Sequence, residues 1–166
     1  MPSRAKLESH FGPNGADLME AVPGTGIATN GNVPIHVHFR RNKGVTDETL
    51  RIVGRLDQLE EVVANETSVT DAGMVHLGHL SKLRLLHLSG TCISDAGLAH
   101  LQALPLELLD LCRTSVSDDG LERVAAMKHL KELWIIGCNC SKEAIARFLT
   151  NVLGCKVIAD DNRTGD

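Results

Sequence analysis

The chain has 166 residues, which is the size of one domain rather than two. It carries 17 Lys and Arg against 21 Asp and Glu, and the net charge of −4 argues against nucleic acid or an anionic membrane surface as a partner. With three Phe, one Trp and no Tyr, it also lacks the aromatic platforms on which single-stranded nucleic acid stacks.

The five cysteines are an odd number, and the sequence shows neither a signal peptide nor an apolar run long enough to cross a membrane. Disulfides are typical of oxidising compartments and rare in the cytosol. We therefore expect reduced, mostly buried thiols and a cytoplasmic location.

The first 32 residues are unlike the rest of the chain. Two short helix candidates, AKLESHF and ADLMEAV, precede the Gly- and Pro-containing segment PGTGIATNGN. We expect residues 1–32 to form a partly flexible N-terminal cap that ends in a mobile loop. The alternating segment VPIHVHF, residues 33–39, predicts the entry strand of a domain over residues 33–160, followed by a tail at 161–166. We place His36 and His38 on opposite faces of this strand.

A repeat begins at residue 45. The segments VTDETLRIVGRL, VTDAGMVHLGHL, ISDAGLAHLQAL and VSDDGLERVAAM start 24, 24 and 23 residues apart, and a weaker copy, CSKEAIARFLTN, starts at Cys140. Apolar residues three apart predict that each copy opens with a helix. A Ser or Thr at the N-cap precedes an Asp that favours the helix dipole. The N-caps are Thr46, Thr70, Ser94, Ser117 and Ser141, and the acids are Asp47, Asp71, Asp95 and Asp118.

A segment with the pattern Leu-x-x-Leu-x-Leu follows each helix, for example Leu83, Leu86 and Leu88. Alternation of this kind predicts a strand with one buried face. A helix and a strand in about 24 residues, repeated in register, predict an α/β right-handed solenoid with a curved parallel sheet on the concave side and helices on the convex side. An inward ladder of Thr67, Thr91, Thr114 and Cys138 should satisfy backbone groups of the loops.

The repeats VTDAGMVHLGHLSKLRLLHLSGTC and ISDAGLAHLQALPLELLDLCRTS resemble the leucine-rich repeats of bacterial, planctomycete-type proteins, which are related to the repeats that follow F-boxes. The resemblance covers about residues 33–160 and implies a leucine-rich repeat domain whose partner is a protein or peptide. No F-box is evident upstream, so the resemblance implies no role in ubiquitin ligation.

Because side chains alternate across a strand, the residues between the buried leucines should face the concave surface. They form three columns. The first is Glu61, Leu85, Leu108 and Glu132; the middle is His38, Val63, His87, Asp110, Trp134 and Ile158; the third is Arg40, Asn65, Ser89, Cys112, Ile136 and Asp160. We predict a binding face made by Trp134, Leu108, Leu85, His87, Asp110, Glu132, Val63 and Ile136, with Trp134 as its anchor.

These columns favour a module that binds a protein or peptide. The alternative is a structural or assembly subunit that uses the same face for self-association or a permanent complex, and the N-terminal segment is a third occupant of that face. The trio Cys112, His87 and Asp110 also suggests a hydrolase, but an open sheet offers no oxyanion hole and no water-excluding pocket. We therefore predict no enzymatic activity and no catalytic residues.

We also predict neither a cofactor nor a metal. His38 and His87 should lie about 10 Å apart, too far for one ion. The pair Cys138 and Cys140 lacks a second pair at the spacing of a zinc site.

Overall fold

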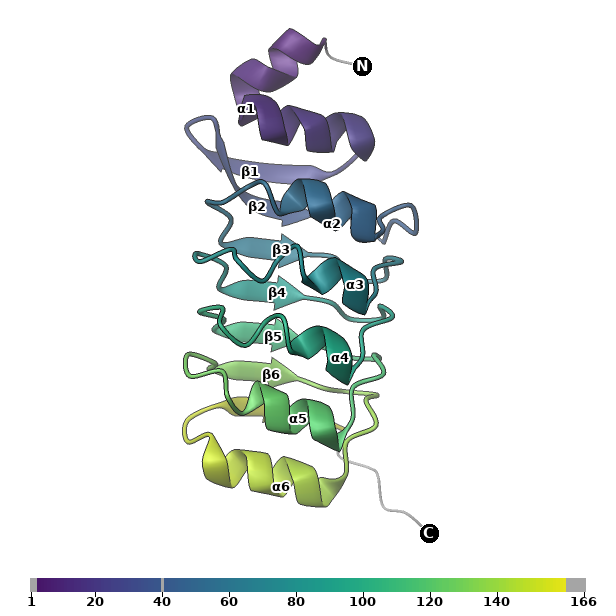
Figure 1. Ribbon diagram of the computed structural model, residues 1–166, viewed down its shortest axis with the longest axis vertical. Coiled ribbons are helices and arrows are strands. Elements are labelled where there is room, and N and C mark those ends of the chain that lie inside the picture. The colour runs from purple at the N-terminus through teal and green to yellow at the C-terminus, as the bar shows by residue number, and fades with distance from the viewer. Residues whose placement is uncertain (1–2, 40, 161–166) are drawn as a thin grey trace.

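Seven strands follow one another in chain order across a single sheet in the computed structural model, which describes residues 3–39 and 41–160 (Figure 1). The first pair, β1 and β2, is antiparallel and every later pair is parallel. The strands are β1 (Gly26–Asn30), β2 (Val33–His38), β3 (Glu61–Val63), β4 (Leu85–His87), β5 (Leu108–Asp110), β6 (Glu132–Trp134) and β7 (Lys156–Ile158).

One helix separates each strand from the next between β2 and β7. Figure 1 shows these helices stacked in a column that runs alongside the stack of strands. The helices are α1 (Arg4–Ala21), α2 (Asp47–Val53), α3 (Asp71–Met74), α4 (Asp95–Leu98), α5 (Asp118–Val124) and α6 (Lys142–Asn151). The predicted α/β solenoid, with a sheet on one side and helices on the other, is confirmed.

The core is a set of apolar rows between the sheet and the helices. Val62, Leu86, Leu109 and Leu133 occupy the same register on adjacent strands and are fully buried. The repeated Leu positions therefore point inward as predicted, and burial of about 2 kcal/mol per side chain accumulates along the stack.

The threonine ladder is confirmed. The hydroxyls of Thr67, Thr91 and Thr114 each donate to the carbonyl three residues earlier, at 2.6–2.7 Å. Cys138 takes the next position, and its Sγ donates to the Leu111 carbonyl at 3.0 Å. Buried backbone oxygens in the loops thus find donors without water.

The helix acids make a contact that the sequence did not predict. Asp71 accepts a hydrogen bond from the backbone N–H of Ser94 at 2.8 Å and another from the Ser94 hydroxyl, so it joins its own repeat to the next. The other acids repeat this arrangement one repeat further along: Asp47 with Thr70, Asp95 with Ser117, and Asp118 with Ser141. We call these four contacts the aspartate ladder. The predicted N-cap residues therefore also donate the hydrogen bonds that join one repeat to the preceding one.

The aspartate ladder approaches the glycine of the Asp-Ala-Gly motif closely, although Asp118 makes the same bonds to Ser141 where the last copy has Ala144. A Cβ added at Gly97 would lie 2.5 Å from Asp71 Oδ1, and one added at Gly73 would lie 2.5 Å from Asp47 Oδ1. The first repeat has Thr49 at this position, where the described chain holds no preceding ladder acid. The last copy has Lys142 at the acid position, where the described chain holds no following helix.

The N-terminal segment differs in part from its prediction. The two helix candidates form the two halves of α1, which are separated by a kink at Gly12, where φ is 70°. The expected loop is wrong for Gly26–Asn30, which forms β1 and pairs with β2 across the two-residue turn Gly31–Asn32. Gly31 has a φ of 65°, which a turn of this length accepts most easily from glycine. This turn was the sequence signal for the hairpin.

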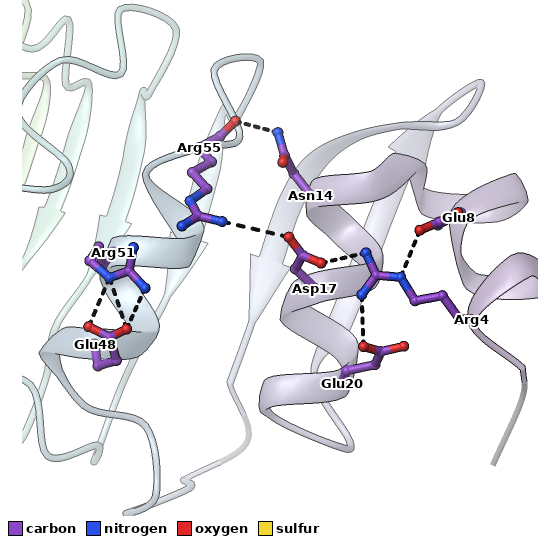
Figure 2. A network of polar contacts seen from close by, with 8 residues as sticks. All are labelled: Arg4, Glu8, Asn14, Asp17, Glu20, Glu48, Arg51 and Arg55. Atoms are coloured by element: carbon purple, nitrogen blue, oxygen red, sulfur yellow. Dashed lines mark hydrogen bonds and ion pairs between the residues drawn. The ribbon is translucent and has the colours of Figure 1, made fainter.

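Arg4 fastens the two halves of α1 together (Figure 2). Its guanidinium donates to Glu8 at 2.7 Å, to Asp17 at 2.6 Å and to Glu20 at 2.8 Å. Asp17 also lies 3.6 Å from Arg55, which follows α2. These contacts attach α1 to the N-terminal end of the stack, where it packs on α2, β1 and β2.

We expect Asp71→Ala to lower the free energy of unfolding by about 1.5–3 kcal/mol, because the Ser94 N–H loses a charged acceptor. Urea denaturation monitored by circular dichroism measures this loss. Asp119→Ala is the matched control, since Asp119 also lies in the first turn of α5 and the described residues of other repeats make no ladder contact with it. Its loss should stay below about 1 kcal/mol. Equal losses would show that the acids act only through the helix dipole.

We expect Gly97→Ala to lower the free energy of unfolding by about 1–3 kcal/mol, although alanine is favoured over glycine in a helix by about 1 kcal/mol. The reason is the 2.5 Å approach of the new Cβ to Asp71. In the double variant Asp71→Ala, Gly97→Ala the two losses should be less than additive. Strict additivity in the same urea experiment would contradict this explanation.

Candidate binding face

The predicted columns lie on the sheet surface opposite the helices, which we call the open face. Leu85 pairs in register with Glu61 on one side and with Leu108 on the other, and Asp110 pairs with His87 and Trp134. The first and middle columns are confirmed over β3 to β6. Arg40, predicted in the third column, lies outside the described residues.

Five apolar side chains meet on the open face. Val63, Leu85, Leu108 and Trp134 are half-buried, and Ile136 is 40% exposed. We call them the apolar patch. Helix α1 lies at the end of the stack rather than over this face, so it is not the occupant considered from the sequence (Figure 1).

Trp134 is held in place by its neighbour in the strand. Its indole N–H donates to Glu132 at 2.9 Å, and Lys156 on β7 contacts the same carboxylate at 3.2 Å. The indole N–H, followed by Lys156, lowers the pKa of Glu132 from its ordinary value. Glu132 therefore orients the side chain of Trp134, the predicted anchor. It can do so because residues two apart in a strand lie on the same face of the sheet.

Asp110 does not present its carboxylate to solvent, which corrects our expectation for this residue. It is 4% exposed, and it accepts a hydrogen bond from the Cys112 N–H at 3.0 Å and lies 3.7 Å from His87 Nδ1. Burial alone would raise its pKa, but the contacts with His87 and Cys112 outweigh burial, so its pKa is below the ordinary value. Asp110 thus orients His87 and the following turn.

Three histidines surround Glu61. The carboxylate lies 3.3 Å from His38 Nε2, 3.6 Å from His36 Nδ1 and 4.0 Å from His87 Nε2. The placement of His36 and His38 on opposite faces is wrong, because residues two apart in a strand share a face, and their rings are nearly parallel at 6.5 Å. This group of Glu61 and three imidazoles, which we call the histidine cluster, was missed for that reason.

Lys and Arg side chains accompany the other carboxylates around the open face. Glu66 lies 3.4 Å from Arg41 and 3.3 Å from Arg113. Glu107 contacts Lys131 at 2.6 Å and also Arg84, and these two cations lower the pKa of Glu107. Exposed pairs of this kind contribute little stability, but they neutralise the rim of the face.

The trio Cys112, His87 and Asp110 holds no reactive thiolate. Cys112 is buried, and burial, followed by the neighbouring Asp110, raises the pKa of its thiol to about 12. The thiolate is the nucleophilic form of cysteine, so this thiol is unreactive at neutral pH. Burial and the Asp110 carboxylate therefore disfavour the thiolate that the hydrolase alternative requires.

Within residues 3–39 and 41–160, no three His, Cys, Asp or Glu side chains are arranged so that they could hold a metal ion. The five cysteines form no disulfide, and four of them are buried. No helix in the described part of the chain is long and apolar enough to cross a membrane.

Neither a family model nor a curated protein matches the sequence. Solved structures do resemble the fold. Internalin C2 from Listeria monocytogenes str. 4b F2365 has a TM-score of 0.54 at 20% identity, over 66% of this chain and 46% of that one. The LRR ectodomain of the receptor kinase SOBIR1 from Arabidopsis thaliana has a TM-score of 0.54 at 17% identity, over 93% of this chain and 87% of that one. This chain has the leucine-rich repeat fold.

A third solved structure, that of PEPR1-AtPEP1, has a TM-score of 0.53 at 18% identity and matches 82% of this chain. The chain spans 46% of the internalin C2 chain and 19% of the PEPR1-AtPEP1 chain. Structural similarity at 20% identity or below establishes the fold alone. The binding partner has to be inferred from the surface of this chain.

We expect Cys112 to resist alkylation by iodoacetamide at pH 7.5 in the native protein, because its thiol stays protonated. Cys92, the exposed cysteine, should react. Peptide mass spectrometry after a timed pulse identifies the labelled residue, and unfolding in guanidinium should make all five cysteines reactive. Native labelling of Cys112 as fast as Cys92 would restore it as a candidate nucleophile.

Proposed function

We propose that this chain is a leucine-rich repeat module that binds a protein or peptide through the open face of its sheet. The supporting observation is the apolar patch, which runs over consecutive strands and which no helix of the described chain covers. A patch of this kind with a charged rim is typical of an interaction site. Trp134, Leu108 and Leu85 would supply the apolar contacts, Val63 and Ile136 would extend them, and His87 and Glu132 would border them.

The proposal extends to the class of partner and its location. A net charge of −4 opposes binding to nucleic acid or an anionic membrane. Reduced cysteines fit the cytoplasm, and the Asp-Ala-Gly repeats fit the bacterial, planctomycete-like type. We propose no enzymatic activity, cofactor or metal.

The second candidate is an assembly subunit that buries the same patch against another copy or a permanent complex. Two further exposed leucines favour association with another copy at the end of the stack in addition to the patch, since Leu149 is 44% exposed and Leu153 is 88% exposed. Both lie in or next to α6, which together with β7 forms the last repeat. Self-association would bury these groups without any foreign partner.

We expect the variant Trp134→Ala, Leu108→Ser to lose captured proteins while it keeps the circular dichroism of the wild type, because both residues are half-buried on the open face. The measurement is affinity capture from source-cell lysate with mass spectrometry of the retained proteins. Val75→Ser is the matched control, since Val75 is 51% exposed and directly follows α3.

Proteins retained by the wild type and by Val75→Ser, but not by the double variant, would support the proposal. Identical profiles for all three would contradict it. Sedimentation velocity over a hundredfold range of concentration separates the second candidate, because a subunit that self-associates gains mass with concentration and the double variant does not.

A further inference from the structure

Glu61 differs from three other glutamates around the open face. Glu66, Glu107 and Glu132 each contact a Lys or Arg side chain at 2.6–3.4 Å. Within the described residues, the basic groups within 4.0 Å of Glu61 are the three imidazoles of the histidine cluster. The side chain is 17% exposed, so it is partly dehydrated yet reachable from solvent.

The neighbours of Glu61 within the described residues are imidazoles rather than Lys or Arg side chains. His87 lies between two carboxylates, 4.0 Å from Glu61 and 3.7 Å from Asp110, so its ring is shared. With histidine counted as neutral, as in the net charge of −4, the cluster carries the negative charge of Glu61, which a cationic side chain would complement.

The apolar patch begins one strand from Glu61. Leu85 and Leu108 follow Glu61 in the first column, and Trp134 lies on the strand after Leu108. Adjacent strands are about 4.8 Å apart, which puts Leu108 about 10 Å and the strand of Trp134 about 14 Å from Glu61. An extended peptide advances about 3.3 Å per residue, and its alternate side chains share a face. A residue two positions from a residue at Glu61 thus reaches about 7 Å, between Leu85 and Leu108, and one four positions away reaches about 13 Å, close to the strand of Trp134.

We propose that the open face binds an extended peptide segment that places a Lys or Arg side chain on Glu61 and apolar side chains two and four residues away on Leu108 and Trp134. This inference rests on the proposed function and names the chemistry of its partner. The cation would make charge-assisted contacts with Glu61, and the apolar residues would cover the patch.

Other charged groups lie near the cluster. They include Asp110 next to His87, Glu107 with Arg84 and Lys131, Glu132 with Lys156 three strands away, and Glu66 between Arg41 and Arg113. All of these carboxylates have partners, so none replaces Glu61 as the acceptor.

The test is selection of a displayed library of random 12-residue peptides on the immobilised full chain at pH 7.5. We expect the enriched peptides to share a basic residue with apolar residues two and four positions away. The dissociation constant of a synthetic enriched peptide should rise about tenfold or more with Glu61→Gln, and by a similar factor when the peptide's basic residue is replaced by glutamine. The two changes together should cost little more than either one.

Glu107→Gln is the matched control, because it removes the same charge from a carboxylate that already has Lys131 and Arg84 as partners. It should change the dissociation constant less than about twofold.

The outcomes separate the two proposals. Enriched peptides that bind equally well to Trp134→Ala, Leu108→Ser, or no enrichment at all, would contradict the proposed function and this inference with it. Peptides that require the patch but lack the basic residue, or whose basic residue contributes equally in Glu61→Gln, would overturn this inference alone.

Discussion

One carboxylate fastens each repeat to the next. In the aspartate ladder, the acid of each helix accepts the N–H and the hydroxyl of the residue that begins the following helix, at 2.7–2.8 Å for the N–H. These bonds also lower the pKa of Asp118. Because each helix is joined to its strand by the leucine core, a fixed spacing of the helices favours a fixed register of the strands. The columns of the open face depend on that register, so the position of every proposed contact residue follows from this contact.

Repetition decided how much of the structure the sequence could predict. Four copies with the same spacing establish which residues point inward, and the columns through Leu85 and His87 then follow from the alternation of side chains. The segments outside the repeat had no such support. The sequence of Gly26–Asn30 is short and polar, which favours a loop. Gly31 is the residue that indicates the turn of a hairpin there. His36 and His38 were assigned the wrong alternation.

The alternation of side chains along a strand also does not tell how deeply a side chain is buried. Asp110 occupies its predicted column, yet the Cys112 N–H draws its carboxylate inward, and the depth of that turn depends on atoms that a pattern of residue types does not specify. The result is a face with two chemistries. Apolar side chains dominate around Trp134, whose indole N–H donates to Glu132. The end at β2 and β3 instead carries the carboxylate of Glu61 among three imidazoles. This difference between the two ends of the open face would fix the direction in which a peptide binds, because each end of the peptide meets a different kind of surface.

The close approach of Gly97 to Asp71 makes each repeat a unit that is compatible with its own copy. A repeat carries the acid that the following helix needs and the glycine that makes room for the preceding acid. Duplication or deletion of one whole unit in the gene would therefore preserve both halves of every junction. Such changes would lengthen or shorten the face by one row of about 4.8 Å. Evolution could in this way change the length of ligand that the open face contacts without requiring a new kind of contact between repeats.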